Sequence, residues 1–412
     1  MLKYRNSCRS CGHFKLEQIL NLGQQTIQGS FVYPNKPTPP TRAIDSTIVI
    51  CDIKTGGCGL VQNLVSISPE ILYSNYGYRS SVSQTMRDHL SKIINDVLDF
   101  FSHKGVSLNS VLDIGANDLF TLKQYPKHIK RVGIDPSNII NEVEKDGVFT
   151  INDCFPTPSL TNEKFDIISS IACFYDIEDP TSFCHKIKHH LNDDGIWIVE
   201  FAYLPFVFNN LSYDGMVHEH LCLYSIATFE NIIQRCGLKI LKAEENDTNG
   251  GSLQLWIIKS ENNLFSSETF KDSLINLKIK EFEMALEDPL TYSSFRQRIL
   301  DHKTDLTNLV KSLKAQNKKI HIYGMSTKLN TILNYCGIGP DLIECAAERT
   351  PEKYGAKTIS GIPMVSEEQS RKTVDVYLVG PYHFKEEILK READTIKRGV
   401  KFLFPLPEIT II

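Results

Sequence analysis

Four cysteines near the start of the chain have the residue type and the spacing of a metal site. Two lie in CRSC and two in CDIKTGGC: Cys8, Cys11, Cys51 and Cys58. Two cysteine pairs about forty residues apart supply a tetrahedral thiolate set, and nearby glycines let backbone amides face the sulfurs. The second pair is spaced C-x6-C rather than C-x2-C, and His13 is an alternative ligand. We predict a structural zinc ribbon, because four thiolates leave no open coordination position for catalysis.

A second group of polar residues lies at the predicted ends of strands. In VLDIGAND, residues 111–118, an apolar strand pattern ends in an acid, a glycine turn and a helix start, and Asp135 ends the next strand. Gly115 would permit close approach of a ligand, and Asp135 would accept hydrogen bonds from ribose hydroxyls. Because GxGxxG is absent, S-adenosylmethionine (SAM) is favoured over NAD. The predicted cofactor-binding residues are Asp113, Gly115, Asn117, Asp135 and Asp153.

Alternating strand and helix patterns must position these groups. Strands are predicted at 110–114, 131–134, 165–169, 195–201, 238–246 and 252–259, with helical segments between most of them. A charged helical stretch follows, broken near Asp288 and Pro289, and alternation resumes at 320–323, 342–346, 374–379 and 401–404. This order predicts two α/β sheets with crossover helices, joined by a helical bridge.

Composition and charge exclude several classes of protein. The 412 residues are 42% hydrophobic and 23% charged, which is typical of a globular chain with two to four domains. Lys plus Arg number 45 against 49 Asp plus Glu, so no basic field favours nucleic acid. The longest apolar stretch, 196–208, is too short to span a membrane, and no secretion signal precedes the CRSC motif. We therefore expect a cytoplasmic protein without membrane or nucleic-acid partners, and a monomer is favoured.

Four further motifs lie along the chain: YGYRSS at 76–81, HEH at 218–220, NGGS at 249–252 and YGMSTKLNT at 323–331. Through these motifs, the cysteine pairs and DIGAND, the whole chain resembles the SAM-dependent sugar C-methyltransferases of deoxysugar pathways. The resemblance implies a Rossmann-like class I methyltransferase core with a small N-terminal zinc ribbon and a second Rossmann-like C-terminal domain. The expected parts are a zinc-binding region at 1–70, the core at 71–260, the bridge at 261–315 and a nucleotide-sugar-binding α/β domain at 316–412.

The resemblance also implies the reaction, methylation of a nucleotide-linked 4-keto-6-deoxy sugar on the carbon beside the ketone, C-3. A carbon can attack a methylsulfonium only after losing a proton, and the ketone delocalises the resulting charge as an enolate. His220 matches the family's base, and Glu219 would orient it or contact the sugar. Tyr76 and Tyr78 match a tyrosine-rich loop that would stabilise the oxyanion or position the sugar.

This chain departs from the family's pattern near the expected base. Several members carry a histidine where Tyr175 and Asp176 stand here, Val217 replaces a tyrosine, and Leu119 replaces a glycine. Tyr175 and His218 are therefore candidates for the missing roles. The departures leave the acceptor carbon, the stereochemistry and the sugar open.

Four further residues are predicted to contact the substrate. Asn249 and Ser252 lie in NGGS, which is either a plain hairpin turn or a turn that faces the sugar. Lys328 and Lys353 are either surface charges or partners of the diphosphate, which suits a small-residue turn before a helix.

Three other functions are compatible with parts of the pattern. O-methylation of a sugar hydroxyl would use the same scaffold. A non-catalytic methyltransferase-like binding protein would explain Leu119 and Tyr175. A zinc-dependent nucleic-acid binder is compatible with the four thiols, but the net charge of -4 and the lack of a basic aromatic stripe oppose it.

Overall fold

The N-terminal part of the chain builds small antiparallel sheets. The structure is a computed structural model that describes residues 2–27, 30–36, 38–39, 43–73 and 77–412. The main N-terminal sheet has the order β12-β5-β4-β2, and β12 comes from far along the chain. Its strands are β2 (Leu16–Gln25), β4 (Ile44–Cys51), β5 (Val61–Asn63) and β12 (Cys222–Leu223). Beside it, β1 (Leu2–Tyr4) pairs with β6 (Val65–Ile67), and α1 (Pro69–Tyr73) follows.

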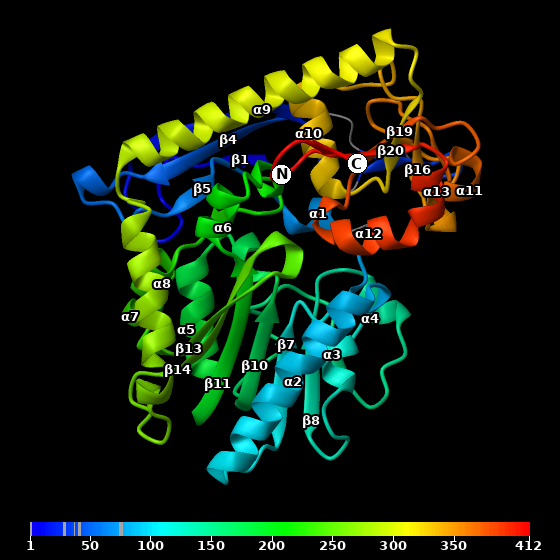
Figure 1. The fold of residues 1–412 in the computed structure, drawn as a ribbon. Coiled ribbons are helices and arrows are strands. Elements are labelled where there is room, and N and C mark those ends of the chain that lie inside the picture. The colour runs from blue at the N-terminus through cyan, green and yellow to red at the C-terminus, as the bar shows by residue number, and fades with distance from the viewer. Residues whose placement is uncertain (1, 28–29, 37, 40–42, 74–76) are drawn as a thin grey trace.

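The central sheet has the order β13-β14-β11-β10-β7-β8-β9 (Figure 1). Its strands are β7 (Ser110–Ile114), β8 (Lys130–Ile134), β9 (Phe149–Ile151), β10 (Phe165–Ile171), β11 (Leu191–Ala202), β13 (Leu238–Asn246) and β14 (Ser252–Lys259). Neighbouring strands are parallel, except that β14 runs antiparallel to both of its neighbours. The strands expected from periodicity are confirmed, whereas β9 was not predicted. This is the class I methyltransferase arrangement, and the strand order reverses between β7 and β10, where such sheets bind ligands.

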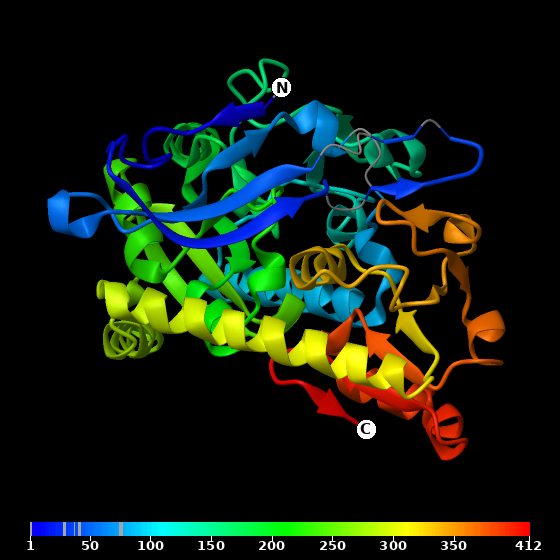
Figure 2. The ribbon, with the colours of Figure 1, turned by 90° about the horizontal axis from the view of Figure 1, so that it is seen from above.

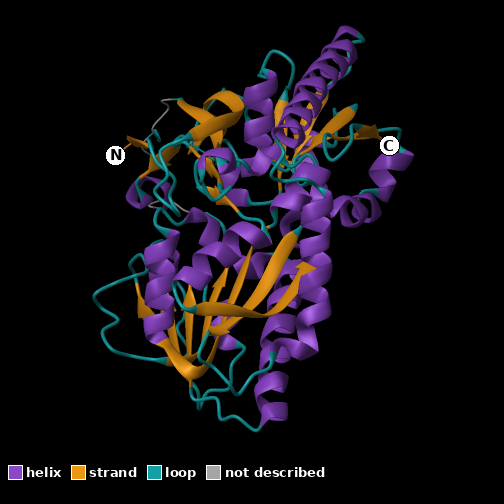
Figure 3. Ribbon diagram, turned by 90° about the vertical axis from the view of Figure 1, so that its left-hand side faces the viewer, coloured by secondary structure: helices purple, strands orange, loops and turns teal. Residues whose placement is uncertain are grey.

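Helices cover both faces of the central sheet (Figure 3). On one face lie α2 (Gln84–Lys104), α3 (Phe120–Lys123) and α4 (Ile139–Glu142), and on the other lie α5 (Pro180–His190) and α7 (Ile226–Arg235). The α2 helix begins at the N-cap Ser83 and ends at Gly105, which is left-handed. Its buried residues Leu90, Ile94 and Val97 recur at helical spacing and pack on the sheet.

The bridge consists of two helices, α8 (Lys271–Glu283) and α9 (Pro289–Ala315). The expected break is confirmed, because Asp288 caps α9 and Pro289 begins it. Figure 2 shows α9 running beside the N-terminal sheet toward the last part of the chain. Its buried face joins one hydrophobic cluster with Leu20 and Ile48 of that sheet and with the C-terminal part.

The C-terminal part is a second α/β unit with the sheet order β18-β16-β15-β19-β20-β21. Its strands are β15 (Ile320–Tyr323), β16 (Cys345–Glu348), β18 (Met364–Ser366), β19 (Val376–Val379), β20 (Lys401–Phe404) and β21 (Thr410–Ile411). They are parallel except β21. Its helices are α10 (Thr327–Cys336), α11 (Glu367–Ser370), α12 (Lys385–Arg391) and α13 (Ala393–Lys397). The short strands β3 (Phe31–Val32) and β17 (Lys357–Thr358) pair, so this unit also contacts the N-terminal part.

One more helix, α6 (Leu204–Asn209), lies between the central sheet and the C-terminal unit. Within the described ranges, no helix combines the length and the apolar sequence that a membrane crossing requires.

Candidate active site and metal centre

The four cysteines predicted from the sequence converge in space. Their sulfur atoms all lie within 4.8 Å of one another, with Cys8 3.6 Å from Cys58 and Cys11 3.5 Å from Cys51. Tetrahedral zinc with Zn–S bonds of about 2.3 Å holds its sulfurs about 3.8 Å apart, so the set fits this ion. The expected alternative ligand, His13, instead pairs through Nε2 with Thr55 Oγ1 at 2.9 Å. Bound zinc would supply structural stabilisation here.

A short helical turn between Cys51 and Cys58 accommodates the longer C-x6-C spacing. Residues Ile53–Thr55 form a short 3-10 helix that ends at Gly56, whose φ is 94°. The next residue, Gly57, leaves no room for a side chain, because a Cβ there would lie 2.6 Å from Cys51 Sγ. The backbone N–H of Cys58 then donates to Cys51 Sγ at 3.3 Å, which favours a thiolate.

The loop after β7 lies against the end of β8, as the VLDIGAND pattern predicts. The backbone N–H groups of Gly115 and Ala116 donate to Ile134 O at 2.8 and 3.1 Å. Gly115 has a φ of 77°, and a Cβ there would come within 3.2 Å of Cys173. The N–H of Asn117 donates to Asp135 Oδ2 at 2.8 Å. The loop and the acid at the end of β8 are therefore held together at the point where the strand order of the sheet reverses.

The other two acids of the predicted cofactor set differ in exposure. Asp113 is 3% exposed, accepts a hydrogen bond from Ser169 Oγ at 2.6 Å, and burial raises its pKa to about 7. Asp153 is exposed after β9 and accepts a hydrogen bond from Thr157 Oγ1 at 2.6 Å. Asp113 lies near the carboxyl end of β7 and is buried, and Asp153 lies two residues beyond the carboxyl end of β9.

The described part of the YGYRSS motif, residues 77–81, contacts the DIGAND loop. Asn117 Nδ2 donates to Tyr78 O, and Ser80 N donates to Asn117 Oδ1, both at 3.0 Å. The side chain of Tyr78 is 47% exposed, and desolvation together with the charge of Asp118 raises its pKa to about 12. Tyr78 is therefore a neutral hydrogen-bond donor at pH 7. The other tyrosine of this prediction, Tyr76, lies outside the described residues.

His220 has a defined tautomer. Its Nδ1 lies 2.7 Å from Gly215 O, and because a carbonyl only accepts hydrogen bonds, Nδ1 carries the hydrogen and Nε2 keeps its lone pair. Desolvation and the charge of Lys328 lower the pKa of His220 to about 4, so the imidazole is neutral at pH 7. The Tyr175 ring packs against it, with 4.3 Å between ring centroids. The arrangement presents a neutral base beside a phenol.

Two carboxyl groups flank this pair. Burial raises the pKa of Glu219 to about 7, and burial together with Glu219 raises the pKa of Asp176 well above its usual range. His218 takes a different direction, since its Nε2 contacts Asp45 O of β4 at 3.3 Å. The structure therefore brings Tyr175 and His220 together, places Glu219 near Asp176, and turns His218 toward the N-terminal sheet.

Three of the four predicted substrate residues, Lys328, Asn249 and Ser252, lie in or beside the NGGS turn. Lys328 Nζ donates to Asn249 O at 2.9 Å and lies 3.4 Å from His383 Nε2, at the contact between the core and the C-terminal unit. Ser252 Oγ, by contrast, donates within its own turn, to Thr248 O at 2.9 Å.

Lys353 lies apart from the contact between Lys328 and Asn249. Its Nζ pairs with Glu348 Oε1 at 3.2 Å and donates to Met325 O at 3.3 Å. The structure thus places it at the carboxyl ends of β15 and β16, over the ring of Phe31 at 5.0 Å.

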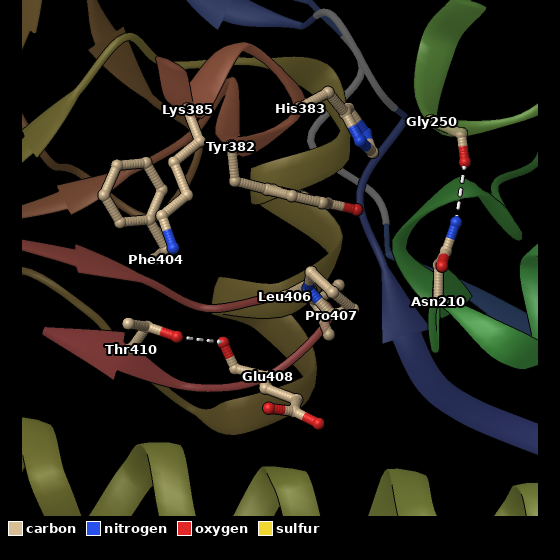
Figure 4. Close-up of a pocket in the computed structure, with 10 residues that line it drawn as sticks. All are labelled: Asn210, Gly250, Tyr382, His383, Lys385, Phe404, Leu406, Pro407, Glu408 and Thr410. Carbon is tan, nitrogen blue, oxygen red and sulfur yellow. Dashed lines mark hydrogen bonds between the residues drawn. The ribbon is translucent and has the colours of Figure 1, made fainter. Parts of the chain in front are cut away.

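A cavity of about 350 Å³ borders the contact between the core and the C-terminal unit (Figure 4). Its lining combines aromatic, amide and charged groups: Asn210, Gly250, Tyr382, His383, Lys385, Phe404, Leu406, Pro407, Glu408 and Thr410. Asn210 Nδ2 donates to Gly250 O at 3.1 Å, and Tyr382 donates to the buried Asp214 at 2.8 Å. Sequence reasoning missed this cavity, because its walls come from segments about 40 to 170 residues apart.

Sequence reasoning also missed a buried carboxylate at the end of β11. Glu200 accepts hydrogen bonds from His89 Nε2 at 2.8 Å, Asn246 Nδ2 at 3.0 Å and Gln254 Nε2 at 3.1 Å. Asn246 Oδ1 in turn accepts from the N–H of Thr248 at 2.9 Å, so the cluster holds the start of the NGGS turn. The one signal in the sequence is a glutamate inside the apolar stretch 196–208.

Comparisons with known proteins identify the family. The chain matches three family models: "C-methyltransferase C-terminal domain" over residues 247–407, "Methyltransferase domain" over 86–243 and "Putative zinc binding domain" over 8–73. C-methyltransferase NovU of Streptomyces niveus is 24% identical over 417 residues, which cover 99% of this chain and 97% of that protein. By homology, the chain is a SAM-dependent C-methyltransferase. The expected resemblance to C-methyltransferases is therefore confirmed, and the model matched over 8–73 supports the predicted zinc site, whereas the sugar substrate stays a prediction.

Solved structures align with less than half of this C-methyltransferase. The plantazolicin methyltransferase BpumL is 16% identical and covers 42% of this chain and 86% of its own, with a TM-score of 0.34. The PH0226 protein of Pyrococcus horikoshii OT3 is 14% identical and covers 44% and 94%, with a TM-score of 0.36. The class I assignment follows from the strand order of the central sheet.

The point between β7 and β10 where the strand order reverses suits SAM in this C-methyltransferase. At Gly115 a side chain would meet Cys173 and the backbone φ is positive, so the loop after β7 requires glycine at this position. Asp135 accepts one hydrogen bond at Oδ2, from Asn117, which leaves an acceptor position for a ribose hydroxyl.

Proposed function

We propose that this C-methyltransferase methylates C-3, the carbon beside the ketone, of a nucleotide-linked 4-keto-6-deoxy sugar. The observation that carries the proposal is the His220 tautomer, because deprotonation of a carbon acid needs a neutral base with a free lone pair. Similarity to NovU over nearly the full length of both chains supports C-methylation. The 4-keto sugar and the acceptor carbon come from the resemblance of the motifs.

The proposed chemistry begins at His220. Nε2 removes the proton from C-3, the C–H electron pair forms the C–C double bond of an enolate, and the charge moves to the ketone oxygen. Tyr175 and Tyr78 are proposed to donate hydrogen bonds to this oxygen, which stabilises the charge as it develops. Glu219 orients the imidazole or the sugar. SAM supplies the electrophilic methyl group, and Asp113, Gly115, Asn117, Asp135 and Asp153 are the proposed contacts that hold it in line with the carbanion.

The nucleotide end of the substrate is proposed to lie between the core and the C-terminal unit. The ammonium group of Lys328 lies close enough to His220 to lower its pKa, and it also contacts the NGGS turn. A diphosphate bound there would keep the sugar within reach of the base. Asn249, Ser252 and Lys353 complete the proposed substrate set, and residues 316–412 the proposed substrate-binding domain.

A deuterium-exchange assay tests this function. The protein is incubated in D₂O with a nucleotide-linked 4-keto-6-deoxy sugar, first without SAM and then with it. We expect deuterium at C-3 without SAM and a methyl group on the same carbon with it. His220→Asn should slow both reactions by about 10²- to 10⁴-fold, as expected for loss of a general base.

The matched control is His185→Asn, the same change at an exposed position of α5. It should leave both rates unchanged. A methyl group found on oxygen without any exchange at C-3 would support O-methylation instead, and an active His220→Asn variant would exclude His220 as the base.

A further inference from the structure

The two segments that carry Tyr175 and His220 are both held by the N-terminal part of the chain. Residues 174–178 follow β10, and residues 217–221 precede β12, so neither segment is close in sequence to the four cysteines of the proposed zinc site. Strand β12 nevertheless pairs with β5, with Cys222 opposite Gln62. The strand that follows the proposed base in the chain is therefore part of the N-terminal sheet.

Asn63 bonds to the backbone on both sides of His220. Its N–H donates to Leu221 O at 2.9 Å, and its Nδ2 donates to Val217 O at 3.3 Å. Asn63 is 1% exposed, and its Oδ1 accepts the N–H of Val65 at 3.1 Å, so its amide orientation is determined. These bonds fix the two ends of the short segment that carries the base.

Arg9 joins this segment to the segment of Tyr175. Its side chain is 0% exposed, and its Nε donates to Glu178 Oε2 at 3.2 Å while Nη1 donates to Asn63 O. Nη2 donates to Ser66 Oγ at 2.7 Å, and Ser66 donates to the same Glu178 oxygen at 2.6 Å. Only a guanidinium has enough rigid donors to hold these three partners at once.

Arg9 also lies within the proposed metal-binding loop, between Cys8 and Cys11. Its backbone N–H donates to Gln62 Oε1 at 3.0 Å, and Gln62 Nε2 donates to Cys8 Sγ at 3.3 Å. Arg9 therefore connects the proposed metal-binding loop to both segments of the proposed site.

We propose that Arg9 is a positioning residue that aligns Tyr175 with His220 by holding Glu178 and Asn63 together. The zinc-binding region then has a second task beside folding, because it determines the relative position of two parts of the site. The roles of Tyr175 and His220 rest on the function proposed above, whereas the alignment itself is a property of the fold.

The test uses the full-length, zinc-loaded protein and three variants. Arg9→Lys keeps the charge but loses the fork of donors, so we expect faster backbone hydrogen exchange in peptides covering both 172–180 and 215–223. Glu178→Gln removes the charge that pairs with Arg9, at a partly exposed side chain. Hydrogen exchange should therefore increase in 172–180 alone. The control Arg235→Lys changes an arginine that binds the same loop at Ser10 Oγ, at 2.7 Å, and touches neither segment.

Turnover and metal content separate positioning from folding. For Arg9→Lys we expect kcat to fall by about tenfold to a hundredfold, as for a small misplacement of reacting groups, with KM changed less. Zinc content and the affinity for SAM should stay within about twofold of wild type.

Two results would overturn the proposal. One is hydrogen exchange in Arg9→Lys that matches the control in both segments. The other is a loss of activity that only parallels loss of zinc. If the wild-type protein fails to exchange deuterium into the keto sugar, the proposed function fails, and the peptide exchange still decides the role of Arg9.

Discussion

The protonation state of His220 is the property on which the proposed deprotonation most depends. Its pKa of about 4 means that about 97% of the chains carry the neutral imidazole at pH 5.5. An unshifted histidine, with a pKa of about 6.5, would be neutral in only about one chain in eleven at that pH. Burial is the main cause of the shift, and the charge of Lys328 adds to it. We therefore predict that His220 does not titrate between pH 8 and pH 5.5.

NMR of protein labelled with ¹⁵N-histidine measures this directly. The His220 signal is assigned by its absence in His220→Asn. We expect hydrogen on Nδ1, a lone pair on Nε2 and no change of either signal down to pH 5.5. Lys328→Met removes a positive charge, which favours the imidazolium, so the pKa of His220 should rise. Lys372→Met, the same change at an exposed lysine of the C-terminal unit, should leave it unchanged.

The reasoning would be refuted by titration of His220 near pH 6.5, because burial would then not control the imidazole. A hydrogen on Nε2 would refute it as well, since the Gly215 carbonyl would not select the tautomer and the proposed base would lack its lone pair.

Three further predictions concern stability and metal. Tyr382→Phe removes the hydrogen bond to buried Asp214 and should lower the unfolding free energy by about 1.5–3 kcal/mol in urea titrations; a change below about 0.5 kcal/mol would contradict it. Asp113 has a folded pKa of about 7, above its ordinary 3.8, so the folded chain binds this proton more tightly and the unfolding free energy decreases as the pH rises between these values. Asp113→Asn should therefore stabilise the SAM-free protein at pH 8, by up to about 4 kcal/mol, and not at pH 4; equal melting shifts at both pH values would contradict this. Zinc analysis should find one ion per chain, and its removal by a chelator should increase hydrogen exchange in β4, whereas full protection without metal would contradict a structural role.

Local sequence patterns predicted the strands that are long enough for the spacing of their apolar residues to be recognised. The long strands of the central sheet and the break before Pro289 were predicted because apolar spacing and capping residues are local properties. The strand expected at 342–346 begins later, at Cys345, because Leu342 and Ile343 belong to a turn in which both of their N–H groups donate to Gly339 O. Their side chains are buried there, so the apolar run marked burial rather than a strand.

Contacts between distant segments could not be predicted in this way. Strand β12 has two residues, too few for any period, and it exists because β5 offers it a partner. The joining of Arg9 to Glu178 follows the same logic, since either residue alone looks like a surface charge. The cysteines were the exception, because metal ligands carry their own spacing rule and reveal a long-range contact in the sequence.

Neutral and positively charged groups occupy different parts of the proposed site. Around His220 the titratable groups are shifted toward their neutral forms, since His220 has a lowered pKa and Glu219 and Asp176 have raised ones. An enolate forming there would meet a neutral base, a neutral phenol and less carboxylate charge than unshifted acids would carry, which lowers the cost of its own charge. Lys328 supplies the cation, and it does so at the contact with the C-terminal unit, where the anionic part of a nucleotide sugar would lie. A tyrosine in place of a histidine at residue 175 fits this division, because a phenol can donate to the oxyanion without adding a second imidazole that titrates near pH 7.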